Sequence, residues 1–183
     1  AVFQDLKGYE WATESILELN RMGIISGVNA IEFNPQENVT REEFVKMISL
    51  AFGIVNPDAV CAFTDVDPED WYYSSVASAY QYGIVNGNSN GRFGIGEPIT
   101  REDMAVLLDR LLTRLNIPLS EWVYDLFEDD DMISDYARVA VYRMRSNQFF
   151  NGVGENQCAP REFANRASAA KMIYGVYLKT KTD

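Results

Sequence analysis

The four residues Thr40-Arg41-Glu42-Glu43 form a motif that the chain contains three times, and they decide the fold that we expect. The motif returns as Thr100-Arg101-Glu102-Asp103 and, in weakened form, as Asn165-Arg166-Ala167-Ser168. Thr40 can cap a helix while Glu43 reaches back to the N–H of the capping residue, which is a capping box. Each copy therefore predicts a helix start, with the structural caps Thr40, Glu43, Thr100, Asp103 and Asn165.

An arginine is kept one residue inside each of these helix starts, as Arg41, Arg101 and Arg166. A cation at this place opposes the helix dipole, whose positive end lies at the N-terminus. A first turn chosen only for stability more often contains Asp, Glu or Pro. We therefore favour a ligand-binding role for the three arginines over a structural one, and we expect them to face an anionic group.

Other residues recur at fixed distances from the caps, which is the signature of an internal repeat. Aromatic residues lie 29 residues before each cap, at Trp11, Trp71 and Tyr136. Glycines lie 13 residues before each cap, at Gly27, Gly87 and Gly152, and Phe-x-Asp triplets further upstream end at Asp5, Asp65 and Asp129. The spacing predicts repeats at about 1–55, 61–115 and 125–183.

Each repeat is expected to consist of a helix, a loop and a second helix. The first helix should start at the aromatic residue and end near Gly23, Gly83 or Gln148, because glycine readily adopts the left-handed cap conformation. The second helix has apolar residues at i, i+3, i+4 and i+7. These stripes are Phe44, Met47, Ile48 and Ala51; Met104, Leu107, Leu108 and Leu111; and Ala169, Met172, Ile173 and Val176.

A unit of about 50 residues buries too little surface to be stable alone. The three stripes should therefore face one another in a central three-helix core. This predicts one mainly α domain over residues 1–183, with pseudo-threefold internal order. Phe33, Phe93 and Cys158 occupy equivalent positions and are expected to fix the loops to the core, and Trp122 and Tyr124 indicate a packed connector.

Composition excludes several function classes. The chain has 183 residues, 47% of them hydrophobic, and a formal net charge of −11, which argues against nucleic acid and anionic membranes as partners. There is no histidine, the usual general base. No apolar run reaches about 18 residues, so we expect no membrane span. No basic segment followed by an apolar stretch starts at Ala1, so we expect no signal peptide in this sequence.

The remaining candidates for chemistry have structural interpretations that we favour. Cys61 and Cys158 lie far apart and show no metal-ligand spacing, so two small buried side chains are favoured over a disulfide. The acidic run 128–131 lacks the alternating ligands and the turn glycine of a calcium loop, so a solvated turn is favoured. No pair of carboxylates is singled out for catalysis.

The first repeat, with Phe-x-Asp, Trp-Ala, Gly-Ile-Ile-x-Gly, Phe-x-Pro and Thr-Arg-x-Glu, resembles the S-layer homology domain. The resemblance covers nearly the whole chain, and three tandem copies are usual in that family. It implies a three-pronged, pseudo-threefold spindle around a central three-helix bundle. It also implies an extracellular, non-enzymatic module without cofactor or metal, which anchors an exported protein non-covalently to the bacterial cell wall or S-layer.

The ligand implied by the resemblance is a secondary cell-wall polysaccharide that carries pyruvate ketals on N-acetylmannosamine, bound in grooves between adjacent repeats. The family's signature arginine corresponds to Arg41, Arg101 and Arg166. A guanidinium can bind the ketal carboxylate with two parallel hydrogen bonds. Two alternatives stay open: a protein–protein module in surface-layer assembly, and binding of polyamine-modified peptidoglycan, a cationic target that an acidic surface would suit.

The other candidate ligand contacts are weighed against structural roles. Trp11, Trp71 and Tyr136 are favoured as core anchors over sugar stacking, because large aromatics dominate burial. Asp5, Asp65 and Asp129 are favoured as braces of a helix start over ligand contacts, although they could also orient the arginines. Gly27, Gly87 and Gly152 most simply serve backbone geometry. Repeat three departs from the pattern, so the site at Arg166 is expected to be the weakest.

Overall fold

The computed structural model describes residues 3–121 and 125–181, so the predicted packing of Trp122 and Tyr124 lies outside the described residues. Within these ranges the chain forms α-helices, the short 3-10 helix η1 (Asp130–Met132) and isolated backbone bridges, with no longer strand. The helices are α1 (Glu10–Arg21), α2 (Arg41–Ala51), α3 (Tyr73–Gln81), α4 (Arg101–Arg114), α5 (Arg138–Ser146) and α6 (Arg166–Lys181). The predicted mainly α class is confirmed.

The second helix of each repeat begins at the arginine, directly after its cap. The Thr40 hydroxyl accepts a hydrogen bond from the Glu43 N–H at 3.4 Å, and the Thr100 hydroxyl accepts one from the Asp103 N–H at 3.3 Å. The Asn165 side chain accepts the Ser168 N–H at 2.8 Å. Each cap satisfies one of the N–H groups that have no partner within a helix.

The first helix of each repeat starts less regularly than its sequence pattern indicates. α1 begins one residue before Trp11, whereas α3 begins two residues after Trp71 and α5 two residues after Tyr136. All three ends have the expected left-handed residue, with φ values of 73° at Gly23 and Gly83 and 64° at Gln148. Gln148 thus adopts the conformation that glycine supplies in the other two repeats.

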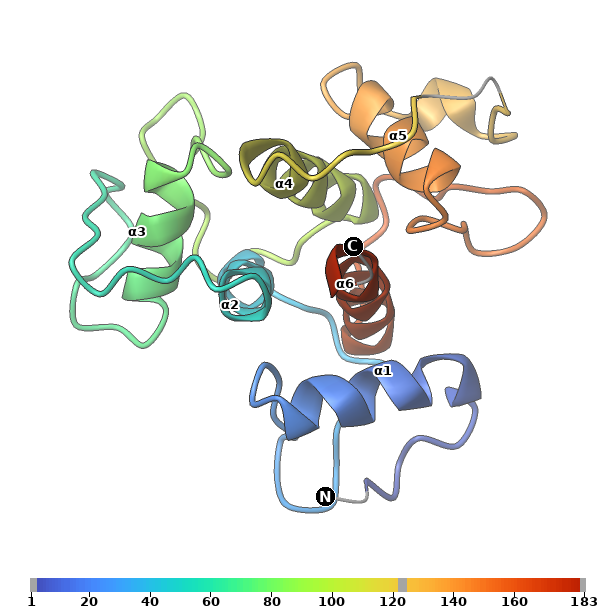
Figure 1. Cartoon of the computed structure of the whole chain (residues 1–183), viewed down its shortest axis with the longest axis horizontal. Coiled ribbons are helices and arrows are strands. Elements are labelled where there is room, and N and C mark those ends of the chain that lie inside the picture. The colour runs from blue at the N-terminus through green and yellow to red at the C-terminus, as the bar shows by residue number, and fades with distance from the viewer. Residues whose placement is uncertain (1–2, 122–124, 182–183) are drawn as a thin grey trace.

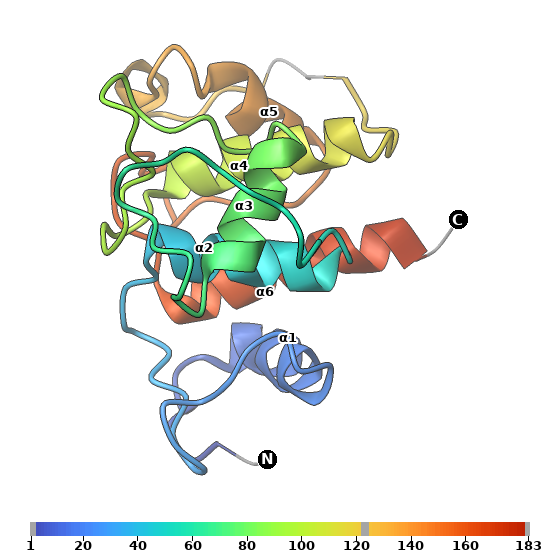
Figure 2. The same ribbon diagram turned by 90° about the vertical axis from the view of Figure 1, so that its left-hand side faces the viewer.

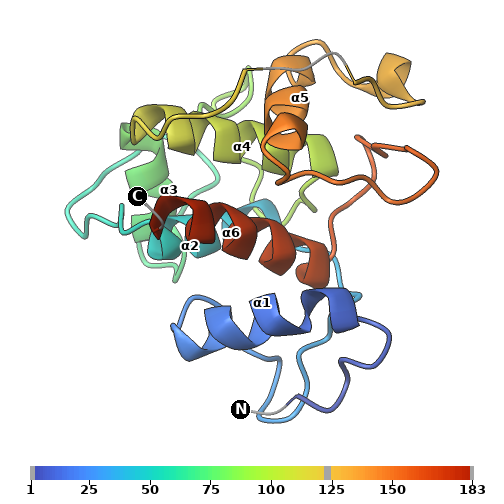
Figure 3. The same cartoon turned by 45° about the vertical axis from the view of Figure 1, so that its right-hand side comes forward.

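The helices α2, α4 and α6 lie together at the centre, and α1, α3 and α5 lie outside them (Figure 1). The outer helices pack across repeat boundaries: α3 against α2, α5 against α4, and α1 against α6. Figure 2 shows α3 crossing α2, and Figure 3 shows α1 beside α6, so the first and last helices of the chain are packing partners. The apolar stripes of the central helices are buried, except that Ala51 is half-buried. Threefold symmetry and the repeat limits stay predictions.

Three buried residues just before the helix caps form a closed ring of backbone hydrogen bonds. The Val39 N–H donates to the Ala164 carbonyl at 3.0 Å, the Ala164 N–H to the Ile99 carbonyl at 2.9 Å, and the Ile99 N–H to the Val39 carbonyl at 2.9 Å. All three residues are almost completely inaccessible to solvent. Because an unpaired buried N–H or carbonyl is costly, every repeat needs the other two to satisfy its backbone.

A second set of backbone bonds surrounds this ring. The N–H groups of Arg41, Arg101 and Arg166 donate, each at 2.9 Å, to the carbonyls of Glu97, Glu162 and Glu37 respectively. The N–H group of the residue that starts each central helix is thus bound to the loop of the next repeat. The three helix starts are held at the same end of the molecule as a consequence.

Several polar and sulfur-containing residues have roles that the sequence only partly indicated. Cys61 and Cys158 are free thiols, and Cys158 is buried in the core with Phe33 and Phe93. In the acidic run 128–131, Glu128 and Asp131 are exposed, as expected of a solvated turn. Asp130 forms an ion pair with Arg138 and accepts a hydrogen bond from the Tyr142 hydroxyl, so this turn is fixed to α5.

The repeated glycines make room for the repeated phenylalanines. A Cβ atom added to Gly87 would lie 2.5 Å from the ring of Phe63, and one added to Gly27 would lie 2.5 Å from the ring of Phe3. Gly87 also has a φ of 73°, which strains any side chain. The backbone-geometry interpretation of these glycines therefore has a specific physical cause in the packing of the loop on its own phenylalanine.

Comparison of Gly87 with Gly91 tests this cause, because the two share a loop and nearly the same φ. Gly91→Ala meets no atom within 4 Å and should destabilise only through φ strain, by about 1–2 kcal/mol. Gly87→Ala must also displace the Phe63 ring, which adds about 1–3 kcal/mol. Urea unfolding measures both. Equal losses would contradict a packing role for Gly87.

The closed ring predicts that the chain does not fold in parts. Fragment 1–115 lacks α6, the partner of α1, and the Ala164 groups that pair with Val39 and Ile99. It should melt without a cooperative transition, as should fragment 125–183. Mixing the two fragments should restore a transition in differential scanning calorimetry. A fragment 1–115 that melts cooperatively near the temperature of the intact chain would refute the interdependence of the repeats.

Candidate functional site

The three arginines share one conformation, in which the side chain is tied to a loop of the next repeat. The Nε atom donates to a loop carbonyl in each case: Arg41 to Phe93 at 3.1 Å, Arg101 to Cys158 at 3.0 Å, and Arg166 to Phe33 at 2.9 Å. All three side chains belong to half-buried residues. Each arginine is therefore held at a boundary between repeats, where the sequence placed it only by resemblance.

An aromatic ring lies under each guanidinium. Arg41 lies 5.3 Å from the ring centroid of Phe93, and Arg166 lies 4.4 Å from that of Phe33. In repeat three the equivalent residue is Cys158, and Arg101 instead lies 4.8 Å from the ring of Phe150. Cation–π contacts of this kind contribute about 0.5–2 kcal/mol and orient the guanidinium plane. Sequence reasoning missed Phe150, because it belongs to the apolar connector rather than to the Phe-x-Pro position.

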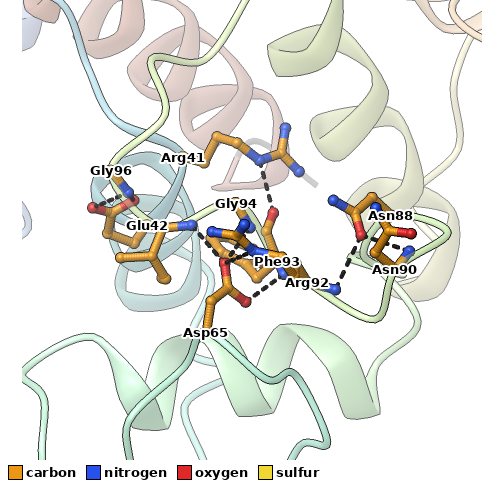
Figure 4. Close-up of polar contacts among 10 residues, drawn as sticks. Arg41, Glu42, Asp65, Asn88, Asn90, Arg92, Phe93, Gly94 and Gly96 are labelled. Atoms are coloured by element: carbon orange, nitrogen blue, oxygen red, sulfur yellow. Dashed lines mark hydrogen bonds and ion pairs between the residues drawn. The ribbon is translucent and has the colours of Figure 1, made fainter.

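The aspartates of the Phe-x-Asp triplets position these loops and do not brace helix starts, so that interpretation is wrong. Asp65 accepts hydrogen bonds from the N–H groups of Phe93, Gly94 and Ile95 at 2.7–3.0 Å. Figure 4 shows Asp65 and Arg41 contacting the same loop. The loop carbonyl that receives Arg41 is thus fixed by a carboxylate of its own repeat.

The other two repeats use the same arrangement. Asp5 accepts the N–H groups of Phe33 and Asn34, and Asp129 accepts those of Cys158 and Ala159. Burial raises the pKa of Asp5 and of Asp65, but the backbone N–H donors outweigh this and hold both pKa values below the usual range. The Asp5 and Asp65 carboxylates therefore stay ionised. All three aspartates act on the arginines indirectly, by orienting the loops whose carbonyls bind them.

Two buried glutamates next to the arginines were not singled out from the sequence. Both carboxylate oxygens of Glu42 accept the Gly96 N–H at 3.0 Å. Glu102 accepts the N–H and hydroxyl of Ser134 at 2.9 and 2.7 Å. Both residues are less than a tenth exposed. Their place directly after the arginine in the repeated motif is a signal that could have identified them, since a buried acid requires hydrogen-bond donors.

The repeated aromatics are exposed, so their interpretation as core anchors is wrong. The exposed fraction is 50% for Trp11, 56% for Trp71 and 63% for Tyr136. The Lys46 ammonium lies 4.9 Å from the Trp71 ring, and the Tyr136 hydroxyl donates to Asp103 at 2.7 Å. All three side chains thus lie outside the core and are accessible at the surface.

Two cavities run between the repeats, and each contains one of the arginines. The Arg101 groove is a cavity of about 540 Å³ whose lining includes Trp11, Arg101, Gly152, Ser168 and Lys171. Residues of all three repeats therefore contribute to one groove. The volume lies in the range of about 300–1,000 Å³ that is usual for small-ligand pockets.

The Arg41 groove has the same construction, with a volume of about 430 Å³. Its lining includes Arg41, Gly87, Phe93, Asp103 and Tyr136, again from all three repeats. Within the described residues, the linings of the two grooves contain none of the aspartates Asp5, Asp65 and Asp129. The candidate residues thus separate into groove residues and loop-positioning residues.

The Arg166 guanidinium donates to two backbone carbonyls of repeat one. Its terminal nitrogen donates to the Ser26 carbonyl at 2.6 Å in addition to the bond from Nε. Burial lowers the pKa of Arg166, and the nearby Glu43 opposes this effect. The altered residues of repeat three do not surround Arg166, because Ser168 and Lys171 lie in the Arg101 groove. The reason given above for a weak site at Arg166 is therefore wrong.

No helix within residues 3–121 and 125–181 combines the length and the apolarity that crossing a membrane requires. The same ranges contain no group of three acidic or cysteine side chains placed to hold a metal ion.

Comparison with known proteins identifies the family. The model of the S-layer homology domain matches residues 2–45 and 62–105, which lie in the first two repeats. The chain is 34% identical over 180 residues to an amylopullulanase of Thermoanaerobacterium thermosulfurigenes and 31% identical over 175 residues to an endoglucanase of Bacillus sp. (strain KSM-635). It is 30% identical over 118 residues to the surface-layer 125 kDa protein of Lysinibacillus sphaericus.

These matches take up most of this chain and little of the relatives. They cover 97%, 93% and 62% of the chain but only 10%, 18% and 10% of the respective relatives. What is shared is therefore a module that makes up a small part of much longer proteins of different kinds. The chain belongs to the S-layer homology family, whose modules bind the cell wall and anchor proteins at the cell surface.

Proposed function

We propose that this chain is a non-enzymatic anchor that binds a secondary cell-wall polysaccharide through carboxylate-bearing sugars, namely pyruvate ketals on N-acetylmannosamine. The observation that carries the proposal is the pairing of a half-buried arginine with an exposed aromatic ring in one groove, Arg101 with Trp11. Family membership supports the cell wall as the target, and this pairing supports an acidic sugar as the ligand.

The arginine suits a carboxylate because it is already oriented. Its Nε atom is bound to the loop carbonyl at 3.0 Å, and the residue lines the groove. That bond does not use the other guanidinium N–H groups. A planar guanidinium binds a carboxylate with charge-assisted hydrogen bonds. Holding the side chain in place beforehand reduces the conformational entropy that binding would otherwise cost.

The aromatic residue suits the sugar that carries the carboxylate. An exposed ring offers an apolar face to the C–H groups of a pyranose, and its own conformational freedom is small. Trp11 comes from α1 while Arg101 starts α4, so a sugar held by both would bridge two repeats. The net charge of −11 repels an anionic polymer, and the local contacts must therefore overcome the overall field.

The polymer is tested with walls from which it has been removed. The purified domain should co-sediment with native walls and should lose most of this binding on walls extracted with acid, which removes secondary polymers. Walls that carry the polymer without ketal pyruvate distinguish the sugar from its carboxylate. Equal binding to native and extracted walls would favour peptidoglycan or a protein partner and would contradict the proposal.

Substitution of Arg101 tests the role of the guanidinium. Since a hydrogen bond to a charged group contributes about 1.5–3 kcal/mol, Arg101→Ala should lower wall affinity roughly ten- to hundredfold. Arg101→Lys should restore only part of it, because an ammonium lacks the planar fork. Co-sedimentation at a series of wall concentrations measures both.

The matched control is Arg21→Ala, which removes the same charge from an exposed site on α1, where Arg21 forms an ion pair with Glu18. It should bind walls as the unmodified chain does. Loss of the Nε bond to Cys158 should reduce the stability of Arg101→Ala by about 1 kcal/mol. A much larger fall in melting temperature with unchanged binding of the folded protein would make Arg101 a structural residue.

A further inference from the structure

The grooves differ in the third residue of each central helix after its cap. This position is Glu43 in α2, Asp103 in α4 and Ser168 in α6. Asp103 lines the Arg41 groove, and Ser168 lines the Arg101 groove. Three residues further along the helix, the Arg41 groove has Val106 and the Arg101 groove has Lys171.

In the Arg41 groove, the chain supplies its own carboxylate to the arginine. The Asp103 carboxylate lies 3.1 Å from the Arg41 terminal nitrogen and accepts the Tyr136 hydroxyl at 2.7 Å. Burial and the neighbouring Asp103 raise the pKa of Tyr136, so its hydroxyl remains a donor at neutral pH. The cation and the aromatic hydroxyl that would meet an acidic sugar are both engaged by Asp103.

In the Arg101 groove, the equivalent side chain, Ser168, does not bind the arginine. The Ser168 hydroxyl contacts the Asn165 side chain at 2.8 Å and the Asn165 carbonyl at 3.0 Å, so it is directed to the helix cap. No ion pair with Arg101 occurs in residues 3–121 and 125–181. The Arg101 guanidinium therefore has a loop carbonyl and an aromatic ring as its contacts, but no carboxylate partner.

The charges of the two linings differ accordingly. Arg101 and Lys171 face the single acid Glu162 in the Arg101 groove, which gives a net charge of +1. Arg41 and Arg110 face Glu97 and Asp103 in the Arg41 groove, which gives a net charge of zero. A net positive groove on a chain of net charge −11 is a local attraction for anions that the rest of the surface repels.

We propose that this domain binds the acidic sugar in the Arg101 groove, and that Asp103 prevents carboxylates from binding in the Arg41 groove. Asp103 and Ser168 are then the residues that set which groove accepts a charged sugar. This inference rests on the proposed function, and it goes beyond it because it assigns different ligands to grooves of the same construction. The Arg41 groove remains open to an uncharged saccharide.

Exchanging the two residues tests the assignment without introducing residues foreign to the fold. Each variant copies what another repeat has at the same helix position, and both Ser and Asp are tolerated in a helix first turn. Ser168→Asp places a carboxylate beside Arg101. Asp103→Ser removes the carboxylate from Arg41. Gln81→Glu, on the exposed surface of α3, is the control that adds one negative charge outside both grooves.

The probe is the methyl glycoside of 4,6-pyruvate-ketal mannose, with its carboxyl methyl ester as the uncharged counterpart, measured by isothermal titration calorimetry. The unmodified chain and Gln81→Glu should bind one equivalent of the acid, at Arg101, because Asp103 engages the Arg41 guanidinium and the Ser26 carbonyl engages that of Arg166. Ser168→Asp should weaken this binding at least tenfold, and Asp103→Ser should add a second equivalent. Binding of the ester should be insensitive to both exchanges. Unchanged affinity in Ser168→Asp, or two equivalents in the unmodified chain, would overturn the assignment.

Binding of the same variants to native and acid-extracted walls distinguishes a failure of the groove assignment from a failure of the proposed function. If wall binding depends on the polymer but Ser168→Asp binds walls fully, the proposed function stands and the assignment of the grooves fails. If the unmodified chain binds extracted walls equally well, the proposed ligand fails, and the assignment fails with it. Loss of polymer-dependent binding in Ser168→Asp alone supports both.

Discussion

The ring of hydrogen bonds among Val39, Ile99 and Ala164 is the constraint on which the rest of the structure depends. A buried peptide group must find a partner, and here each partner belongs to a different repeat. The bonds act just before the caps, so they fix where α2, α4 and α6 begin and bring their arginines to one end of the molecule. Three copies satisfy the ring, and fewer copies leave buried groups unpaired.

The grooves follow from the same constraint. Because each central helix starts against the loop of the next repeat, the arginine that begins it is fastened to that loop and not to its own. The outer helices then add an exposed aromatic from a third repeat, as Trp11 does in the Arg101 groove. A single repeat contains all the residue types of a site but cannot assemble them. Closure of the ring and formation of the sites are one event.

Local features could be predicted from the sequence because they arise within a few residues. The caps at Thr40 and Thr100, the apolar stripes and the left-handed helix ends all depend on contacts of short range. The function of Asp65 could not be found this way, because it binds backbone groups 28 to 30 residues away. A Phe-x-Asp triplet close to an expected helix suggests a cap, and only the packed loop shows otherwise.

The burial of side chains and their pairing between repeats also could not be predicted from the pattern of a single repeat. Trp71 lies two residues before α3 and so escapes the face that packs on α2, although its type favours a core. Repeat three has Cys158 where the other repeats have Phe, which indicated a degenerate repeat. Phe150 nevertheless provides the ring beneath Arg101. A substitution in one repeat can alter the groove of its neighbour, as Ser168 of repeat three does in the Arg101 groove.

The packing of α1 on α6 has a mechanical consequence. A tension that pulls residues 3 and 181 apart acts on the outermost helices of the chain, which hold each other. It therefore loads the α1–α6 contact before it reaches the four helices between them. Trp11 belongs to α1 and Lys171 to α6, so they form two walls of the Arg101 groove that the same tension draws apart. End-to-end tension on the chain is thereby coupled to the width of this groove.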